Sequence, residues 1–125
     1  MPEVRTLIAI LRGIRPDEAS GHIEALLEAG FRYIEIPLNS PDWQQSIPQM
    51  VSRYGDQAKI GAGTVLQVEQ VDLLAEAGAS LIVTPNTNPV VIRRAVEAGM
   101  LVYAGCATAS EAFNALEAGA QCLKI

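Results

Sequence analysis

Three ionisable side chains stand in otherwise apolar stretches of this chain. Arg12 directly follows the apolar run 7–11, Glu35 is flanked by two isoleucines, and Lys124 is flanked by a leucine and an isoleucine. Moving a charge out of water costs free energy unless the charge is paired or used. One shared site therefore explains the three placements better than three unrelated structural causes do.

Each of the three residues also has a purely structural interpretation. Arg12 can be the first solvated residue after a strand, Glu35 can be its buried ion-pair partner, and Lys124 can be an exposed lysine near the chain end. These interpretations predict no common site. They stay open at the level of the residues alone.

The chemistry that the three residues could perform together is specific. A buried lysine has a depressed pKa, and its neutral amine attacks carbonyl carbons. A neighbouring carboxyl group can move protons, and an arginine can hold a carboxylate through two parallel hydrogen bonds. A shared site of Lys124, Glu35 and Arg12 thus predicts Schiff-base chemistry on a keto acid.

A repeated tripeptide shows which elements must position these residues. Glu-Ala-Gly occurs four times, ending at Gly30, Gly78, Gly99 and Gly119, and a short, mostly apolar stretch follows each copy. Such a copy is typical of a helix end, a glycine cap and a following strand. A weaker copy, ending at Gly55, precedes the stretch 59–61.

Helix starts are predicted between these strands. Pro16 fits the first turn of a helix, Ser40 is expected to cap the next helix with proline at its first position, and Thr87-Asn88-Pro89 opens another. Thr108 and Glu111 have the spacing of a capping box. The first two strands are expected at 7–11 and 33–38, and the last at 121–125.

The predicted order is six strands alternating with five helices, which implies a parallel sheet with right-handed crossovers. Two α/β architectures fit: a doubly wound open sheet, or about the first six strands and five helices of a TIM (β/α)8 barrel. In both, functional side chains gather at the carboxyl ends of strands. No G-x-G-x-x-G occurs, so a dinucleotide site has little support.

Bulk properties exclude several classes of function. The chain has 125 residues, a net charge near −5, two cysteines and one histidine. A single domain spanning 1–125 is expected, and its acidic balance argues against nucleic-acid partners. It has neither a membrane-length apolar run nor a signal-peptide pattern, and its cysteines lack metal-ligand spacing. We therefore expect a reduced, cytoplasmic protein.

A set of segments resembles a known family. The segments are 7–13 (LIAILRG), 34–41 (IEIPLNSP), 61–65 (GAGTV), 82–86 (IVTPN), 105–108 (GCAT), 117–120 (EAGA) and 123–125 (LKI). In this order they resemble the class I 2-keto-3-deoxy-6-phosphogluconate/6-phosphogalactonate aldolases. The segments 34–41 and 105–108 resemble the galactonate branch more than the gluconate branch.

The resemblance implies a TIM barrel that assembles as a homotrimer and needs no cofactor and no metal. It implies that Lys124 forms the Schiff base, that Glu35 is the acid/base, and that Arg12 and Thr64 bind substrate. The implied reaction cleaves 2-dehydro-3-deoxy-6-phosphogalactonate to pyruvate and glyceraldehyde 3-phosphate.

Two alternatives remain beside that reaction. One is the same chemistry on the gluconate epimer. The other is a catalytically silent, truncated barrel that only self-associates, because members of the family continue through two more βα units and bind the sugar phosphate there.

Overall fold

The computed structural model describes residues 7–125, which form six strands and five helices in strict alternation. The strands are β1 (Ile8–Ile10), β2 (Tyr33–Pro37), β3 (Lys59–Gly63), β4 (Leu81–Val83), β5 (Leu101–Gly105) and β6 (Cys122–Lys124). The helices are α1 (Pro16–Glu28), α2 (Trp43–Tyr54), α3 (Val68–Glu76), α4 (Pro89–Glu97) and α5 (Ala109–Glu117).

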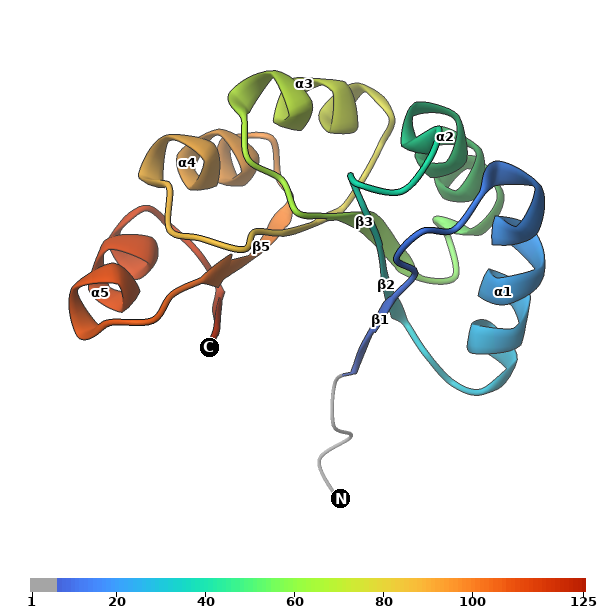
Figure 1. Cartoon of the computed structure of the whole chain (residues 1–125), viewed down its shortest axis with the longest axis horizontal. Helices are drawn as coiled ribbons and strands as arrows, with labels where there is room; N and C mark the ends of the chain where they lie inside the picture. The colour runs from blue at the N-terminus through green and yellow to red at the C-terminus, as the bar shows by residue number, and fades with distance from the viewer. Residues whose placement is uncertain (1–6) are drawn as a thin grey trace.

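The sheet is curved and has its helices on one face, unlike a doubly wound sheet. Its strands lie in the order β1-β2-β3-β4-β5-β6, and each strand pairs in parallel with the next. All five helices lie on the convex side (Figure 1). A doubly wound sheet has helices on both faces and a reversal in strand order. The chain therefore forms an α/β half-barrel.

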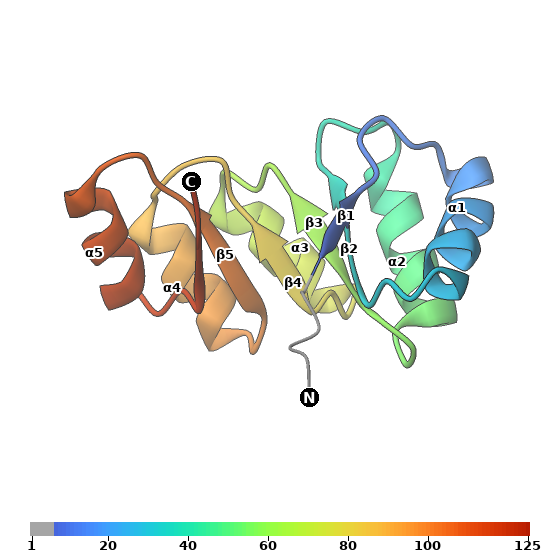
Figure 2. The same ribbon diagram turned by 90° about the horizontal axis from the view of Figure 1, so that it is seen from below.

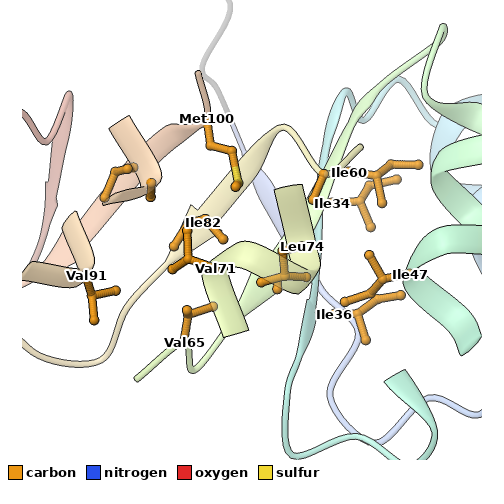
Figure 3. Packing of buried hydrophobic residues seen from close by; sticks show 14 of the residues in the cluster. Ile34, Ile36, Ile47, Ile60, Val65, Val71, Leu74, Ile82, Val91 and Met100 are labelled. Carbon is orange, nitrogen blue, oxygen red and sulfur yellow. The ribbon is translucent and has the colours of Figure 1, made fainter. Parts of the chain in front are cut away.

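The convex face of the sheet packs against the helices. Every second strand residue points to this side, as the pleat requires. Ile34, Ile36, Ile60 and Ile82 are completely buried there, together with helix residues such as Leu74 (Figure 3). The alternate strand residues, among them Glu35 on β2 and Lys124 on β6, consequently face the concave side.

Most of the predicted element ends are confirmed. Pro16 begins α1, Asn88 caps α4 ahead of Pro89, and Thr108 and Glu111 form the capping box of α5. The glycines of the four Glu-Ala-Gly copies all have positive φ, with values of 98°, 80°, 82° and 108° in chain order. The repeat therefore marks helix ends, as predicted.

The weaker copy of the repeat ends differently. Gly55 has a φ of −62° and caps α2 in the right-handed helical conformation. The prediction of a left-handed cap does not extend to this copy. A Cβ at Gly55 would lie 2.5 Å from the carbonyl oxygen of Val51, so close contact with the last helical turn explains the glycine instead.

The predicted start of α2 is wrong. The helix begins at Trp43 with Asp42 as its N-cap, not at Pro41 with Ser40 as the cap. The Ser40 hydroxyl instead accepts a hydrogen bond of 2.9 Å from the main-chain N–H of Gly13. That long-range bond joins the β1–α1 loop to the β2–α2 loop, a contact that no local pattern reveals.

The outer strands are shorter than predicted. β1 covers 8–10 instead of 7–11, and β6 covers 122–124 instead of 121–125. Within residues 7–125, β1 pairs only with β2 and β6 only with β5. Strands with one neighbour have fewer ladder bonds at their ends, which explains the shortening. No helix in the described part of the chain is long and apolar enough to cross a membrane.

Candidate active site

The concave face of the half-barrel carries a cavity of about 220 Å³. Figure 2 looks toward this face, on which the strands lie in front of α3 and α4. The cavity is lined by two strands at each end of the sheet and one in its middle: Ile8, Ile10, Glu35, Val83, Tyr103, Leu123 and Lys124. Two of the predicted site residues, Glu35 and Lys124, thus line the same cavity.

Glu35 is buried at the centre of this arrangement. Its side chain is 3% exposed, and its Oε2 finds no hydrogen-bond partner among residues 7–125. Burial raises the pKa of the Glu35 carboxyl above its usual range, while the positive charges of Lys124 and Arg12 act in the opposite direction. The net effect is a carboxyl group that holds its proton more tightly than a solvated glutamate.

Lys124 lies on β6 and is exposed, which contradicts the expectation of a buried lysine. The described residues provide no strand on the outer side of β6, so the lysine head group remains open to solvent. The main chain of Lys124 is nevertheless fixed, because its carbonyl oxygen accepts a hydrogen bond of 2.9 Å from the N–H of Cys106.

Arg12 lies in the loop after β1 and is also exposed. It forms no ion pair with Glu35 within the described range, so the interpretation of the two residues as a buried salt-bridge pair is wrong. Its charge still reaches Glu35 and lowers the pKa of that carboxyl. Of the three charged groups expected to be buried, only Glu35 is.

Thr64 follows β3 directly and adopts a φ of 55°. The left-handed region is rare for β-branched residues, because the side chain crowds the main chain. Thr64 is half-buried at the carboxyl end of the sheet, next to Gly63, which is in contact with the Glu35 side chain. Strained residues of this kind are concentrated at functional sites, at a cost of about 1–3 kcal/mol each.

Two hydroxyl groups in the segment after β4 bind main-chain groups of the loops at this edge. The Thr84 hydroxyl donates to the carbonyl oxygen of Asn86 at 2.8 Å and accepts from the N–H of Gly105 at 3.2 Å. The Thr87 hydroxyl donates to the carbonyl oxygen of Gly105 at 2.6 Å. These bonds shape a second cavity of about 270 Å³, which Lys124 also lines.

Tyr103 is a site residue that the sequence analysis missed. It lines the cavity of Glu35 and Lys124, and its register partner on β6 is Cys122. Burial raises the Tyr103 pKa, with further contributions from Cys122 and Tyr33. The available signal was its alternation with Gly105, which places Tyr103 on the concave face of β5.

The arrangement brings an amine, a buried carboxyl group and a guanidinium to one end of a parallel sheet. This combination can form an imine with a keto acid and move protons beside it. No group of three His, Cys, Asp or Glu side chains in the described ranges could hold a metal ion.

The known proteins that this chain resembles include several aldolases. The family model for KDPG and KHG aldolase matches residues 3–125. The 2-dehydro-3-deoxy-6-phosphogalactonate aldolase of Escherichia coli K12 is 68% identical over 119 residues, which are 95% of this chain and 58% of the relative. A probable aldolase of the same name from Rhizobium meliloti is 51% identical over 98% of this chain and 58% of its own length.

Solved structures of aldolases are also similar to this chain. A structure described as native KDPGal superposes with a TM-score of 0.94 and 64% identity, covering all of this chain and 62% of the other. The 2-keto-3-deoxy-6-phosphogluconate aldolase of Zymomonas mobilis ZM4 superposes with a TM-score of 0.81 at 27% identity, covering 92% of this chain and 54% of its own.

The chain spans slightly more than half the length of the curated relatives that it matches. The match runs through the segments that carry Arg12, Glu35, Thr64 and Lys124 and extends to the last residue of the chain. The resemblance seen in the sequence is thereby confirmed, and the chain belongs to the KDPG and KHG aldolase family.

Proposed function

We propose that the whole protein is a Schiff-base aldolase that cleaves 2-dehydro-3-deoxy-6-phosphogalactonate to pyruvate and glyceraldehyde 3-phosphate. The observation that carries this proposal is the cavity shared by Lys124 and Glu35, in a chain 68% identical to an aldolase named for that substrate. Identity to the relatives named for the gluconate substrate is lower, 33% for that of Treponema pallidum, which disfavours the epimer.

The reaction begins at the ketone carbon C2 of the substrate. The neutral amine of Lys124 attacks C2, and the resulting carbinolamine takes up a proton on its hydroxyl group and loses water to give a protonated imine. A base then removes the proton of the C4 hydroxyl group, and the C3–C4 bond breaks. Its electron pair moves toward the imine nitrogen and leaves an enamine, while C4 departs as the aldehyde of glyceraldehyde 3-phosphate.

Glu35 is proposed to move both protons, directly or through a water. As a carboxylate it takes the proton of the C4 hydroxyl, and as a carboxylic acid it returns a proton to C3 of the enamine. Hydrolysis of the new imine releases pyruvate and regenerates Lys124. Burial supports this role, because it raises the pKa of Glu35 and so makes its carboxylate a stronger proton acceptor than that of a solvated glutamate.

Arg12 and Thr64 are proposed to hold the carboxylate end of the substrate. Arg12 is exposed at the carboxyl end of β1 and close enough for its charge to affect Glu35. Thr64 lies at the corresponding end of β3. A guanidinium and a hydroxyl at this edge provide the donors that a carboxylate needs.

The proposal also covers the fold, location and assembly of the whole protein. We propose that it closes a TIM (β/α)8 barrel as one domain, which would enclose Lys124, and that it acts in the cytoplasm as a homotrimer. Oligomerisation is supported by a 68% identical chain within a cage designed by fusing symmetric oligomeric domains. The half-barrel supports closure, because its strand order and one-sided helices are those of a barrel wall.

Borohydride reduction in the presence of pyruvate tests the proposed function. It should fix a covalent adduct on Lys124, found by mass spectrometry of tryptic peptides. Lys59 is the only other lysine in the chain and provides the internal control. An adduct on Lys59, or none in the full-length protein, would remove the Schiff-base assignment. Comparing kcat/KM for the two epimers then decides the substrate.

A further inference from the structure

The Glu35 side chain lies directly over the main chain of Gly63. A Cβ built on Gly63 would overlap Oε2 and Cδ of Glu35 and would lie 2.8 Å from its Oε1. The register pairs Glu35 with Gly61 and Gly63 with Pro37, so the glutamate side chain runs along β3 toward its carboxyl end. The carboxyl group therefore occupies the space that a side chain at position 63 would fill.

This contact differs from those of the other crowded glycines in the sheet. A Cβ on Gly61 would overlap the main chain of Leu81, and a Cβ on Gly105 would lie 2.5 Å from the carbonyl group of Pro85. Main-chain atoms in a ladder cannot move aside cheaply. At Gly63 the three nearest atoms all belong to one side chain, which can rotate out of the way. The requirement for glycine at position 63 is therefore tied to where Glu35 lies.

The location of the carboxyl group decides its surroundings. Over Gly63 it is 3% exposed and its Oε2 has no partner in the described part of the chain. The alternative is a carboxyl group turned away from β3 into the open space of the cavity that Glu35 and Lys124 line. A carboxyl group moved there would gain solvent and come closer to the lysine charge, and both changes favour its ionised form.

We propose that Gly63 is a positioning residue of the reaction, whose missing side chain leaves the space in which Glu35 is held back from Lys124. The inference deepens the proposed function and rests on it. Glycine at this position keeps the proton-transfer group near the amine without a salt bridge between them. A salt bridge would hold the lysine protonated and unable to attack a carbonyl.

The alanine variant separates this role from a general loss of packing. Gly63 lies outside the left-handed region, so its main chain accepts alanine. In Gly63→Ala we expect the Glu35 carboxyl to leave its place over β3 and its pKa to fall by about one unit or more. The measurement is a pH titration of the full-length protein with ¹³C-labelled glutamate carboxyl groups, in which Glu35→Gln identifies the Glu35 resonance.

Gly61→Ala is the matched control, because it makes the same change on the same face of the same strand. Its added methyl group meets Leu81, so it should destabilise the fold and leave the Glu35 titration unchanged. Gly21→Ala, where nothing lies within 4 Å of the added carbon, should change neither and serves if Gly61→Ala does not fold. An unchanged Glu35 titration in Gly63→Ala, or an equal shift in a control, overturns the proposal.

A second variant covers the case in which Gly63→Ala does not fold. Adding Glu35→Asp shortens the overlapping side chain by one methylene group and should restore folding. Failure of the double variant to fold would show that the overlap lies elsewhere and would refute the assignment. The titration reports on Glu35 whether or not the protein turns over. A Glu35 shift without a Lys124 adduct would therefore count against the proposed function and not against the placement over Gly63.

Discussion

The main-chain N–H of Leu11 donates to the carbonyl oxygen of Glu35 over 3.0 Å. This bond continues the pairing of β1 with β2 one residue beyond the end of β1 and places Arg12 at the edge where the Glu35 side chain lies. Within residues 7–125 no ion pair joins the two side chains, and the Arg12 charge reaches that carboxyl group from an exposed position. The exposed Arg12 can thus meet a solvent-borne anion while Glu35 stays buried.

The buried carboxyl group predicts a pH dependence of stability. Because the folded state raises the Glu35 pKa, the folded protein binds this proton more tightly than the unfolded chain. The stabilisation is full below the usual glutamate pKa and is lost as the pH rises through the raised value. Urea unfolding at pH 4 and pH 7 should therefore show Glu35→Gln gaining stability relative to the parent toward neutral pH. A gain in the relative stability of Glu35→Gln toward acid pH would contradict the predicted direction.

The same substitution predicts a loss of turnover in the full-length protein. Glu35→Gln removes the group proposed to move protons, so kcat should fall by roughly two to four orders of magnitude. Glutamine keeps the size of the side chain, and pyruvate trapping on Lys124 should be affected less than cleavage. A kcat close to that of the parent would remove Glu35 from the mechanism.

Arg12→Ala should act mainly on substrate binding. Losing a charged hydrogen-bond donor to a carboxylate should raise KM by roughly ten- to a hundredfold with a smaller effect on kcat. Arg15→Ala is the matched control: Arg15 is also exposed but pairs with Asp17 at the start of α1. Steady-state kinetics of the two variants decide the point. Equal effects on KM would indicate a general charge effect instead.

Thr64→Gly should separate stability from binding. Glycine relieves the left-handed strain at φ 55°, which is about 1–2 kcal/mol. Because glycine is more flexible in the unfolded chain, it loses more conformational entropy on folding, and this offsets roughly 0.5–1 kcal/mol of the gain. The free energy of unfolding should therefore change little while KM rises. Thr84→Gly is the contrasting variant. It removes a buried hydroxyl group that makes two hydrogen bonds, so it should destabilise the fold. An unchanged KM in Thr64→Gly would exclude the proposed contact.

The open edges predict self-association of the 125-residue chain. β1 and β6 each have one unpaired side in the described residues, and Ile10 on β1 is 51% exposed. Exposed apolar edges pair with other chains, and inward-pointing charges prevent it. Ile10→Lys should reduce the associated fraction in size-exclusion chromatography with light scattering, while Leu66→Lys, in the loop after β3, should not. A parent chain that elutes as a clean 13.3 kDa monomer would contradict the prediction.

The local sequence determined the elements and the edge at which the polar groups gather. The glycines of the four Glu-Ala-Gly copies, Pro16, the Asn88-Pro89 pair and the Thr108–Glu111 box act within one or two turns, and the structure confirms each of them. Alternation of apolar stretches with helix signals specified a parallel sheet, in which Arg12 follows β1 and Lys124 ends β6. These inferences succeed because hydrogen bonding and steric constraints within a few residues suffice to decide them.

Tertiary structure alone decided the environment of each group. Local patterns did not show that Ser40 binds Gly13 or that the Glu35 carboxyl lies over Gly63. They left open whether Lys124 is buried or exposed, and the structure shows it exposed on a strand that has one neighbour in the described residues. Curvature of the sheet, with all helices on one face, selected the half-barrel over the doubly wound sheet. Burial and steric contact between distant segments depend on how the strands assemble, and this is why the pKa of Glu35 follows from the fold and not from its neighbours in sequence.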